Sequence, residues 1–594
     1  MAETEESDSP LPEGIDATLR SMEGVAAKWH SLPDRRRAAI ARACRRRFGG
    51  LDKDWVKDEV RAMAMDPANH YEEAYNILHT EAYKFASVVA ERLEKVADAL
   101  EGKYTPGSRR VSKGRQAPNG LQVFNCGSLH KDQPGAKLEV WADMSGKIQE
   151  HHKEGPLSTN GKGVCLILGG SGLSFQSAID IIDRVFLYKE CVLFKHNAFK
   201  PMRAFPFEQI FMPLYYRGVY AQCFDHDLKG HHADLMAHPS ITHVHMIGKV
   251  ETHNTVLATL KELKRKEAVP VTSMMGCVTP WIICPGATKG AWKESEIKYH
   301  ATMLAVCFKK NAACLCWSPK VLVLPSEEVW PQRKTFLRVF RKQLAEVPQM
   351  SPYHPDAVPH YEMCKKALRG HCEEIHSVLS QRLEFSIWEP FFKGQCFKKL
   401  MPLWMDMGVL GTDDSKSRRL PLDLEMLTPA IGIATVESKS TADFPLAAAR
   451  ACNQHLFGNL SCMLVYPDPA DKRLDDTVAE LNYGVVCVNT YQQFVYENPL
   501  ARWGPPPGAY TEDSPASGRG SCGNAARIPG ACKTVAMGPF INSKGPLRKP
   551  MQKWVADCLY LIVCWKWFLL LRLIWAIGWH LQYNFHAWFG LHKF

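Results

Sequence analysis

The sequence lacks the features that mark secreted, nucleic-acid-binding and repeat proteins. Its first ten residues, MAETEESDSP, are acidic and hold no apolar run behind a basic region, so a cleaved secretory signal is not expected. The 73 Lys and Arg residues exceed the 62 Asp and Glu residues by only 11, and this excess is spread along 594 residues. We therefore expect no nucleic-acid partner, because such a partner needs a concentrated basic surface. No repeat at solenoid spacing is visible either.

The chain has many cysteines but no compact, regularly spaced framework of them. Twenty cysteines without a secretory signal indicate buried thiols in a reducing compartment rather than disulfides. One region combines thiols with imidazoles, and its members are His360, Cys364, His371, Cys372 and His376. Paired Cys-x-x-Cys spacing is absent there, and the run HYEMCKKALRGHCEEIH has the pattern of a helix. We therefore predict no metal site.

Periodicity divides the chain into a helical part, two α/β parts and a tail. With 46% hydrophobic residues, the chain can bury sizeable cores. Apolar positions recur every three or four residues through the first hundred residues, and Gly102 stands where a helix cap would end this run. The runs VCLILGG, ECVLFKH and THVHMIGK then alternate with helix-like stretches, which is typical of a doubly wound parallel sheet. The predicted regions are a helical N-terminal region at 1–119, α/β domains at 120–272 and 273–515, a connector at 516–553 and a hydrophobic tail at 554–594.

The tail is almost continuously apolar over residues 558–579, CLYLIVCWKWFLLLRLIWAIGW. A helix of this length covers about 33 Å, which is enough to cross a bilayer. Lys566 and Arg572 oppose a spanning position because a charge near the hydrocarbon centre is costly. A spanning helix, an interfacial helix or re-entrant hairpin, and a soluble packing helix all stay open. In each membrane alternative, the basic residues just before the tail favour a cytoplasmic position for the main body.

A short turn with two thiols precedes a β-branched run at residues 311–325, NAACLCWSPKVLVLP. A cysteine at the start of a strand can be a nucleophile, and it attacks as the thiolate. Its activity therefore depends on groups that lower its pKa, accept its proton or stabilise the oxyanion. The turn offers two such thiols, Cys314 and Cys316, and a packing or resolving role is the alternative for a thiol that does not attack.

Four landmarks in order along residues 120–540 resemble the aldehyde dehydrogenase superfamily. Asn311 and Cys316 match the family's catalytic loop, in which an Asn precedes the nucleophilic Cys by five residues. The resemblance also implies ligands for a nicotinamide cofactor, which are Lys195 in VLFKHNAFKP, Gly248 and Lys249 after the strand THVHMIG, and Glu425 in LEMLTP. The segments GVVCVNT and RWGPPPG resemble later active-site loops of the family.

This resemblance implies a fold, a cofactor and an oligomer. The expected fold is α/β and aldehyde dehydrogenase-like, with a Rossmann-type cofactor domain, an α/β catalytic domain, the helical N-terminal region and the hydrophobic C-terminal helix. The expected cofactor is NAD or NADP, and the choice is open because Ala198 stands where an acidic residue often favours NAD. A homodimer or higher homo-oligomer is expected, paired through a β arm near residues 533–542.

Two departures from the family pattern concern the chemistry. The family's general base is a Glu in a Glu-Leu-Gly-Gly motif, and Met274 stands in its place within SMMGCVTP. The loop LGGSGLS holds no Asn for the side-chain amide that helps to bind the oxyanion, and losing one such donor typically costs about 10²- to 10³-fold in rate. Hydrolysis of a thioester needs a base, and Met cannot accept a proton. Water as acceptor, coenzyme A as acceptor, and a catalytically inactive scaffold or membrane-complex subunit all stay open.

The leading interpretation is a membrane-associated enzyme, with its main body in the cytoplasm, that oxidises an aldehyde with NAD or NADP through Cys316. The tail suggests a long-chain or lipid-derived aldehyde, because an anchor would hold the site beside lipid-borne substrates. Simpler interpretations of the same residues also exist. Cys316 can be a structural thiol, Lys195 a surface lysine, Gly248 a turn glycine and Glu425 an ordinary exposed carboxylate.

Overall fold

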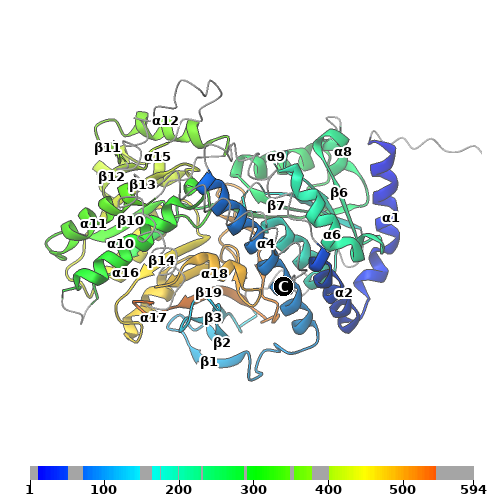
Figure 1. The fold of residues 1–594 in the computed structure, drawn as a ribbon, viewed down its shortest axis with the longest axis horizontal. Helices are drawn as coiled ribbons and strands as arrows, with labels where there is room; N and C mark the ends of the chain where they lie inside the picture. Colours follow the sequence, from blue (N-terminus) through cyan, green and yellow to red (C-terminus); the bar gives the residue numbers. More distant parts are fainter. Residues whose placement is uncertain are drawn as a thin grey trace, which may run out of the picture. The chain divides into compact units, whose positions relative to one another are not determined.

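The computed structural model describes most of the chain between residues 11 and 542 (Figure 1). The described residues are 11–50, 71–146, 163–170, 172–173, 175–198, 200–228, 232–286, 291–347, 354–376 and 400–542. The chain divides into two units, one made of Met1–His130 with Gly135–Ile541 and one made of Lys131–Pro134 with Asn542–Phe594. All helices and strands discussed below lie in the first unit. The predicted tail at 554–594 lies outside the described residues, and no helix within those residues has both the length and the apolar content to cross a bilayer.

The N-terminal region is helical, as predicted, and it is drawn in dark to mid blue in Figure 1. Gly102 ends the last of these helices with a φ of +82°, and the N–H of Lys103 donates to the carbonyl of Asp98 at 3.0 Å. Arg42 joins two of the helices, because its guanidinium pairs with Asp98 at 3.0 Å and with Glu101 at 2.7 Å. The elements are α1 (Glu13–His30), α2 (Asp34–Arg46), η1 (Arg47–Gly50) and α4 (Tyr71–Leu100).

A six-stranded sheet forms the predicted doubly wound domain. Its five main strands are parallel, and a short antiparallel strand completes one edge. In spatial order the strands are β17 (Gly518–Arg519), β8 (Val271–Met275), β7 (Ile241–Gly248), β4 (Val164–Leu168), β5 (Cys191–Lys195) and β6 (Tyr220–Cys223). The intervening helical segments are α5 (Gln176–Ile182), the π-helical η2 (Asp183–Leu187), η3 (Pro201–Arg203), α6 (Ala204–Tyr215), α7 (Asp225–Leu228), α8 (His232–Ala237) and α9 (Val250–Glu262).

The chain order in this sheet reverses at β4. The chain passes from β4 to β5 and β6 on one side and then returns to β7 on the other side. In open α/β sheets, ligands bind at such a switch point, beyond the carboxyl ends of the strands. Leu168 at the end of β4 is in register with Lys195 of β5 and with Met246 of β7. Lys195 and Gly248 therefore end the two strands that flank β4, at the same edge of the sheet.

The larger sheet has eleven strands and carries the thiol turn. Its seven central strands, from β19 to β12, are parallel, and antiparallel strands close both ends. In spatial order the strands are β1 (Ser112–Gln116), β2 (Gln122–Ser128), β3 (Lys137–Ala142), β19 (Ala531–Met537), β15 (Val485–Val488), β14 (Ser461–Val465), β9 (Pro280–Ile283), β10 (Val321–Pro325), β13 (Ala430–Val436), β12 (Leu403–Val409) and β11 (Cys372–Glu374). A two-stranded ribbon, β16 (Arg502–Trp503) with β18 (Cys522–Gly523), lies outside both sheets.

Helices cover the parallel part of the larger sheet and bury its apolar strands. Every residue of β10, β14 and β15 is buried, which explains their near-continuous β-branched and apolar sequences. The helical segments are α10 (Glu294–Lys309), η4 (Lys310–Ala313), α11 (Arg333–Glu346), α12 (Ala357–Ala367), α14 (Asp413–Ser417), α15 (Leu420–Asp423), α16 (Phe444–His455), α17 (Lys472–Glu480) and α18 (Gln492–Glu497).

The strand pairings cross the predicted domain ranges at several points, one of which is β1, because it lies within the range 1–119 and pairs with β2 of the larger sheet. Strands β2 and β3, placed in the cofactor domain by sequence, pair with β19 in the larger sheet. Strand β17, placed in the connector, pairs with β8 of the smaller sheet. The arm predicted near residues 533–542 overlaps β19, which pairs with β15 on one side and with β3 on the other. Both edges of β19 are thus taken within its own chain, and a homo-oligomer stays a prediction that would need another surface.

Candidate active site

The predicted thiol turn joins α10 to β10 through a left-handed bend. Asn311, Ala312 and Ala313 have φ angles of 50°, 50° and 59°, and all three residues are buried. A residue with a Cβ pays about 1–2 kcal/mol for this conformation, so the surrounding packing must hold the bend in place. Strained backbone of this kind is found most often at functional sites. The bend lets the N–H of Cys314 donate to the carbonyl of Asn311 at 2.9 Å.

Cys316 follows this bend and is partly exposed. Its carbonyl oxygen accepts a hydrogen bond from Thr279 Oγ1 at 2.7 Å, which fixes the backbone at the candidate nucleophile. Burial raises the pKa of the Cys316 thiol well above its ordinary value, and the nearby Glu425 and Cys277 raise it further. The sulfur is therefore a neutral thiol near pH 7, and its reaction as a nucleophile requires a partner that removes its proton.

Cys314 has a structural position instead. Its Sγ donates to the carbonyl of Leu427 at 3.2 Å and lies 3.5 Å from the carbonyl of Ala312. Burial raises the pKa of the Cys314 thiol to about 12, so it stays protonated. Cys314 thereby fastens the thiol turn to the loop that carries Glu425.

Lys320 makes a second attachment between the same two segments. Its Nζ donates to the carbonyl of Met426 at 2.7 Å and to the carbonyl of Ala313 in the strained bend. Burial lowers the pKa of Lys320, and the neighbouring Glu425 opposes that change. The lysine thus stabilises the bend by satisfying a buried carbonyl and places positive charge beside the thiols.

Glu425 lies between the thiol turn and the segment that follows β8. Part of the residue reaches the surface, but its Oε1 atom is buried and has no hydrogen-bond partner among the residues that the structure describes. Its carboxyl group packs on Gly276, where an added Cβ would lie 1.6 Å from Oε2. Burial raises the pKa of Glu425 to about 7, against the opposing effect of Lys320. This carboxyl group can therefore gain or lose a proton near neutral pH.

Residues from later in the chain cover β8 and the segment that follows it. Met274 is buried and pairs with Gly518 of β17. Cys277, two residues before Thr279, is fully buried, and its Sγ lies 3.0 Å from Thr279 Oγ1. Burial raises the pKa of the Cys277 thiol to about 11. Within this segment, no side chain can act as a base near pH 7.

Comparison with solved structures assigns this architecture. The chain is similar to γ-glutamyl-γ-aminobutyraldehyde dehydrogenase from Burkholderia cenocepacia, with a TM-score of 0.56 and 13% identity over 89% of this chain and 88% of that chain. It is similar to succinic semialdehyde dehydrogenase from Streptococcus pyogenes in complex with NADP⁺, with a TM-score of 0.56 and 13% identity over 89% and 95%. It is also similar to an aldehyde dehydrogenase C mutant from Pseudomonas syringae in complex with NAD⁺ and octanal, with a TM-score of 0.54 and 12% identity over 89% and 90%.

The chain has the aldehyde dehydrogenase fold. No protein-family model matches the sequence, and no curated protein matches it. The likeness at 12–13% identity concerns the fold, so the chemistry has to be argued from the residues of this chain.

Three of the four residues predicted to bind a cofactor, Lys195, Gly248 and Lys249, lie at the carboxyl edge of the smaller sheet of this aldehyde dehydrogenase fold. Lys195 is partly buried and forms an ion pair with Asp225 at the start of α7. Gly248 ends β7, and a Cβ there would lie 3.1 Å from Met246 Cε, so a larger residue would crowd this turn. Gly169 follows β4, and a Cβ there would lie 2.6 Å from Phe194 Cζ. These glycines and the first N–H groups of α9, which a helix leaves without an internal partner, fit a dinucleotide phosphate.

Lys249 connects this cofactor edge to the thiol site. It precedes α9, and its ammonium group forms an ion pair with Asp356, which precedes α12. His360 of α12 accepts a hydrogen bond at Nδ1 from the N–H of Leu427 at 3.0 Å. Burial lowers the pKa of His360, with Lys249 and Lys320 lowering it further, so the ring stays neutral and can accept. One helix thus touches both a predicted cofactor residue and the loop of Glu425.

Two of the functional contacts were not expected from the sequence. The carboxyl group of Glu425 packs on Gly276 beside three thiols, and its predicted contact with a cofactor ribose stays a prediction. Lys320 has no expected role from the sequence, although a lysine directly before an apolar strand is a signal of a buried charge. Both contacts join segments far apart in the sequence, so periodicity could not reveal them.

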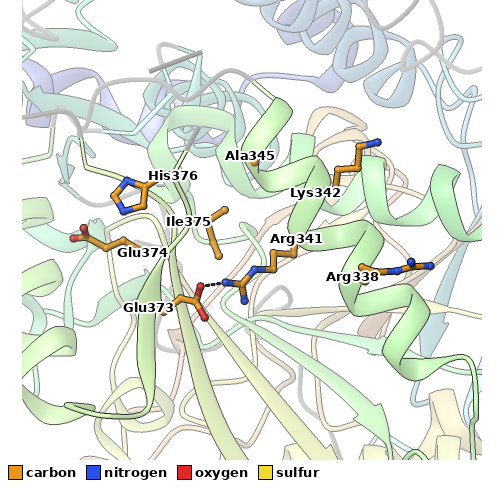
Figure 2. A pocket seen from close by; sticks show the side chains of 8 residues that line it. All are labelled: Arg338, Arg341, Lys342, Ala345, Glu373, Glu374, Ile375 and His376. Atoms are coloured by element: carbon orange, nitrogen blue, oxygen red, sulfur yellow. Dashed lines mark ion pairs between the residues drawn. The ribbon is translucent and has the colours of Figure 1, made fainter. Parts of the chain in front are cut away.

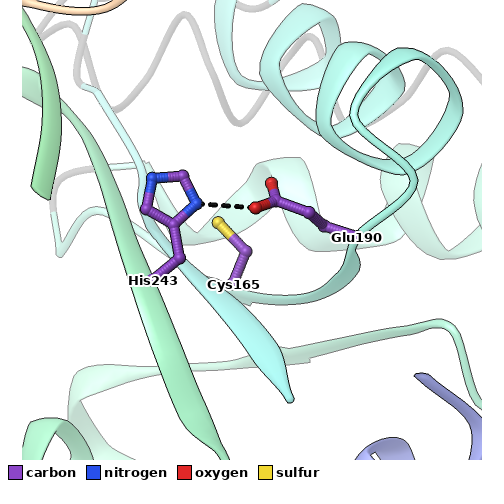
Figure 3. Close-up of side chains that lie close together, drawn as sticks. All are labelled: Cys165, Glu190 and His243. Carbon is purple, nitrogen blue, oxygen red and sulfur yellow. Dashed lines mark hydrogen bonds and ion pairs between the residues drawn. The ribbon is translucent and has the colours of Figure 1, made fainter. Parts of the chain in front are cut away.

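A separate buried group in the smaller sheet has the composition of a metal site. One ligand atom from each of Cys165, Glu190 and His243 lies within 4.8 Å of the others (Figure 3). However, His243 Nδ1 is 2.8 Å from Glu190 Oε1, and its Nε2 is 2.8 Å from Thr272 Oγ1. Arg184 Nη1 also lies 3.7 Å from Glu190 Oε2 and supplies the positive charge there. The group is therefore an internal polar network, and it shares no residue with the His and Cys set considered from the sequence.

An open pocket of about 420 Å³ lies between α11 and β11 (Figure 2). Arg338, Arg341 and Lys342 line it from the helix, and Arg341 forms an ion pair with Glu373 across it. The pocket contains none of the residues predicted for catalysis or cofactor binding. It lies at β11, the edge strand of the larger sheet. Strands β12 and β13 separate β11 from β10, the strand that follows the thiol turn.

Proposed function

We propose that this protein oxidises an aldehyde with NAD or NADP, using Cys316 as the nucleophile. The observation that carries the proposal is the position of Cys316, which follows a strained turn and precedes β10. Helix α12 connects this site to the cofactor edge, because Asp356 pairs with Lys249 and His360 accepts from Leu427. The aldehyde dehydrogenase fold adds support, because solved structures that share it include complexes with NADP⁺ and with NAD⁺ and octanal.

In the proposed reaction, Cys316 Sγ forms a bond to the carbonyl carbon of the aldehyde and gives a thiohemiacetal. Lys195, Gly248 and Lys249 would hold a nicotinamide cofactor, which supplies the acceptor for the hydride of the thiohemiacetal, while the hydroxyl proton leaves to solvent. The acyl group then remains on Cys316 as a thioester, which water or another acceptor must release. The left-handed bend at Asn311 and the hydrogen bond from Thr279 hold the sulfur in place during both bond changes.

The proposal extends to the membrane and to the substrate. The hydrophobic tail would hold the body of the protein at the cytoplasmic face of a membrane. A tethered site would meet aldehydes dissolved in the bilayer, so medium- and long-chain aldehydes are the proposed substrates. A homodimer or larger homo-oligomer is the proposed assembly.

The test is NADH or NADPH production from medium- and long-chain aldehydes by the full-length protein. We expect turnover by the parent protein and by Cys372→Ala, and its loss in Cys316→Ala. Cys372 is the matched control because it is also partly exposed but lies in the edge strand β11, outside the thiol turn. Activity that survives in Cys316→Ala would exclude this thiol as the nucleophile.

A second candidate function is a catalytically inactive scaffold that retains the fold. The neutral state of the Cys316 thiol and the absence of a carboxylate at Met274 favour it. Mass spectrometry of the intact chain after mixing with aldehyde and cofactor separates the two candidates. An acyl adduct on Cys316, or its release on adding coenzyme A, supports the enzyme, whereas an unmodified chain without NADH supports the scaffold.

A further inference from the structure

Two segments hold Glu425 in place. One of them forms hydrogen bonds with the thiol turn, and the other forms a hydrogen bond with the backbone of Cys316. On one side, the carbonyls of Met426 and Leu427 accept hydrogen bonds from Lys320 and Cys314 of the thiol turn. On the other side, Glu425 packs on Gly276. The segment of Gly276 continues to Thr279, which donates to the carbonyl of Cys316. The carboxyl group is thus fixed beside Cys316 by contacts from both directions.

Gly276 is the residue that makes room for this position. An added Cβ would lie 1.6 Å from Oε2, 2.0 Å from Cδ and 2.4 Å from Oε1 of Glu425. These are the three nearest atoms, so the carboxyl group fills the space over this glycine.

The charged and titratable groups around Glu425 leave it able to act as a base. Lys320 contributes the positive charge, and Cys277, Cys314 and Cys316 contribute thiols, which burial keeps protonated near pH 7. Glu425 Oε1 has no hydrogen-bond partner in the described part of the chain, so a lone pair is free to accept a proton from a bound water. The partial exposure of Glu425 and Cys316 gives that water a route to the site.

We propose that Glu425 is the general base that activates water for hydrolysis of the thioester on Cys316, in place of the carboxylate that Met274 lacks. This inference rests on the proposed function. A water proton passes to the Glu425 carboxylate while the water oxygen forms a bond to the thioester carbon. The C–S bond then breaks, the carboxylic acid leaves, and the sulfur departs as a thiolate that takes back the proton from Glu425.

The test isolates this step without a cofactor. A p-nitrophenyl ester of a medium-chain acid acylates the full-length protein, and mass spectrometry follows the loss of the acyl group from Cys316 between pH 5.5 and 9. In the parent protein, the hydrolysis rate rises with pH through an inflection near 7, where Glu425 ionises. In Glu425→Gln, the inflection disappears and the rate falls about 10²- to 10⁴-fold, the usual contribution of a general base. Glu425→Asp keeps the inflection at a lower rate.

Gly276→Ala provides an independent variant, because it moves the carboxyl group without removing it. We expect slow hydrolysis in Gly276→Ala, but no further loss when the same change is added to Glu425→Ala, where the space is already vacant. The double variant also keeps the test valid if Gly276→Ala alone does not fold.

Three results would overturn the inference. Hydrolysis in Glu425→Gln at the parent rate would show that the carboxylate is not the base. A change only in cofactor affinity in this variant would show that the carboxylate binds the cofactor ribose. If the ester does not acylate Cys316, the thioester that Glu425 is proposed to hydrolyse does not form, and the inference fails. Absence of NADH production, together with a Glu425-dependent inflection in ester hydrolysis, would instead refute the proposed oxidation and leave Glu425 as the base.

Discussion

The carboxyl group of Glu425 lies directly on the backbone of Gly276, so closely that a methyl group on this glycine would overlap Oε2 at 1.6 Å. The two residues are far apart in the sequence, because Gly276 follows β8 and Glu425 precedes β13. Their contact places a carboxylate beside the thiols around Cys316. The consequences of burying this carboxyl group can be measured in stability as well as in catalysis.

Glu425 should make the free energy of unfolding fall between pH 5 and pH 8. Burial raises its pKa from an unfolded value near 4.5 to about 7 in the folded chain. A raised folded pKa means that the unfolded chain loses this proton first, so the stabilising contribution is complete below pH 4.5 and is lost as pH rises through 7. The shift corresponds to roughly 2–3 kcal/mol over this range. Urea unfolding at several pH values should show this loss for the parent protein.

Glu425→Gln is the matched control for that measurement, because Gln has a similar shape and does not titrate. The difference in unfolding free energy between the two proteins should grow in favour of Glu425→Gln as pH rises from 5 to 8. Parallel pH profiles for the two proteins would mean that the folded carboxyl group keeps an ordinary pKa.

The buried ion pair between Arg92 of α4 and Asp183 of η2 should be a large contribution to stability. Nε of Arg92 donates to Asp183 Oδ1 at 2.9 Å, both side chains are about 1% exposed, and Asp183 also accepts from the N–H of Gly523 at 2.6 Å. Removing one charge leaves the other buried and unpaired, so Arg92→Met should lower the unfolding free energy by about 3–5 kcal/mol. Urea unfolding measures this loss.

Arg42→Met is the surface control for Arg92→Met. Arg42 of α2 pairs with Asp98 of α4, but the Arg42 side chain is 24% exposed. Exposed pairs of this kind contribute about 0–1 kcal/mol to the free energy of unfolding. The double change Arg92→Met with Asp183→Asn should recover part of the loss, because neither charge is then buried alone. Equal effects of Arg92→Met and Arg42→Met would contradict the burial argument.

Lys195 and Lys249 should both contribute to cofactor affinity. Each lies at the carboxyl edge of the smaller sheet, where a dinucleotide phosphate would be held. Replacing either lysine with Met should raise the Kd for NAD and NADP about tenfold, which corresponds to about 1.4 kcal/mol. Titration followed by calorimetry measures the change. Lys261→Met, at the opposite end of α9, is the control and should leave the Kd unchanged.

Much of the fold could be predicted because its elements depend on local patterns. Lys195 and Gly248 end apolar strands, so their positions at one sheet edge followed from the alternation of strands and helices. The thiol turn could be located because it precedes a β-branched strand, and Cys316 was selected within it by the resemblance of its spacing from Asn311 to the family loop. Gly102 as the end of α4 followed from the preference of glycine for positive φ.

The orientation of Glu425 could not be predicted, because it depends on contacts with residues distant in the sequence. Its position needs the vacant space at Gly276 and the hydrogen bonds of Lys320 and Cys314 to the carbonyls that follow it. The place of β19 is a similar case. Its pattern identifies a strand, but its two partners, β15 and β3, come from distant parts of the chain.

Deleting residues 554–594 should release the protein from membranes. The segment 558–579 holds 22 residues, of which only Lys566 and Arg572 carry a charge, and such a run is drawn to lipid by burial of its apolar side chains. Flotation with phospholipid vesicles should recover the full chain with the lipid and the truncated chain in the soluble fraction. Extraction with alkaline carbonate then separates the two membrane alternatives. A spanning helix stays with the lipid because leaving would expose its whole surface, whereas an interfacial helix is released. If the full chain does not float, the tail packs on protein, and the proposal of a lipid-borne substrate loses its basis.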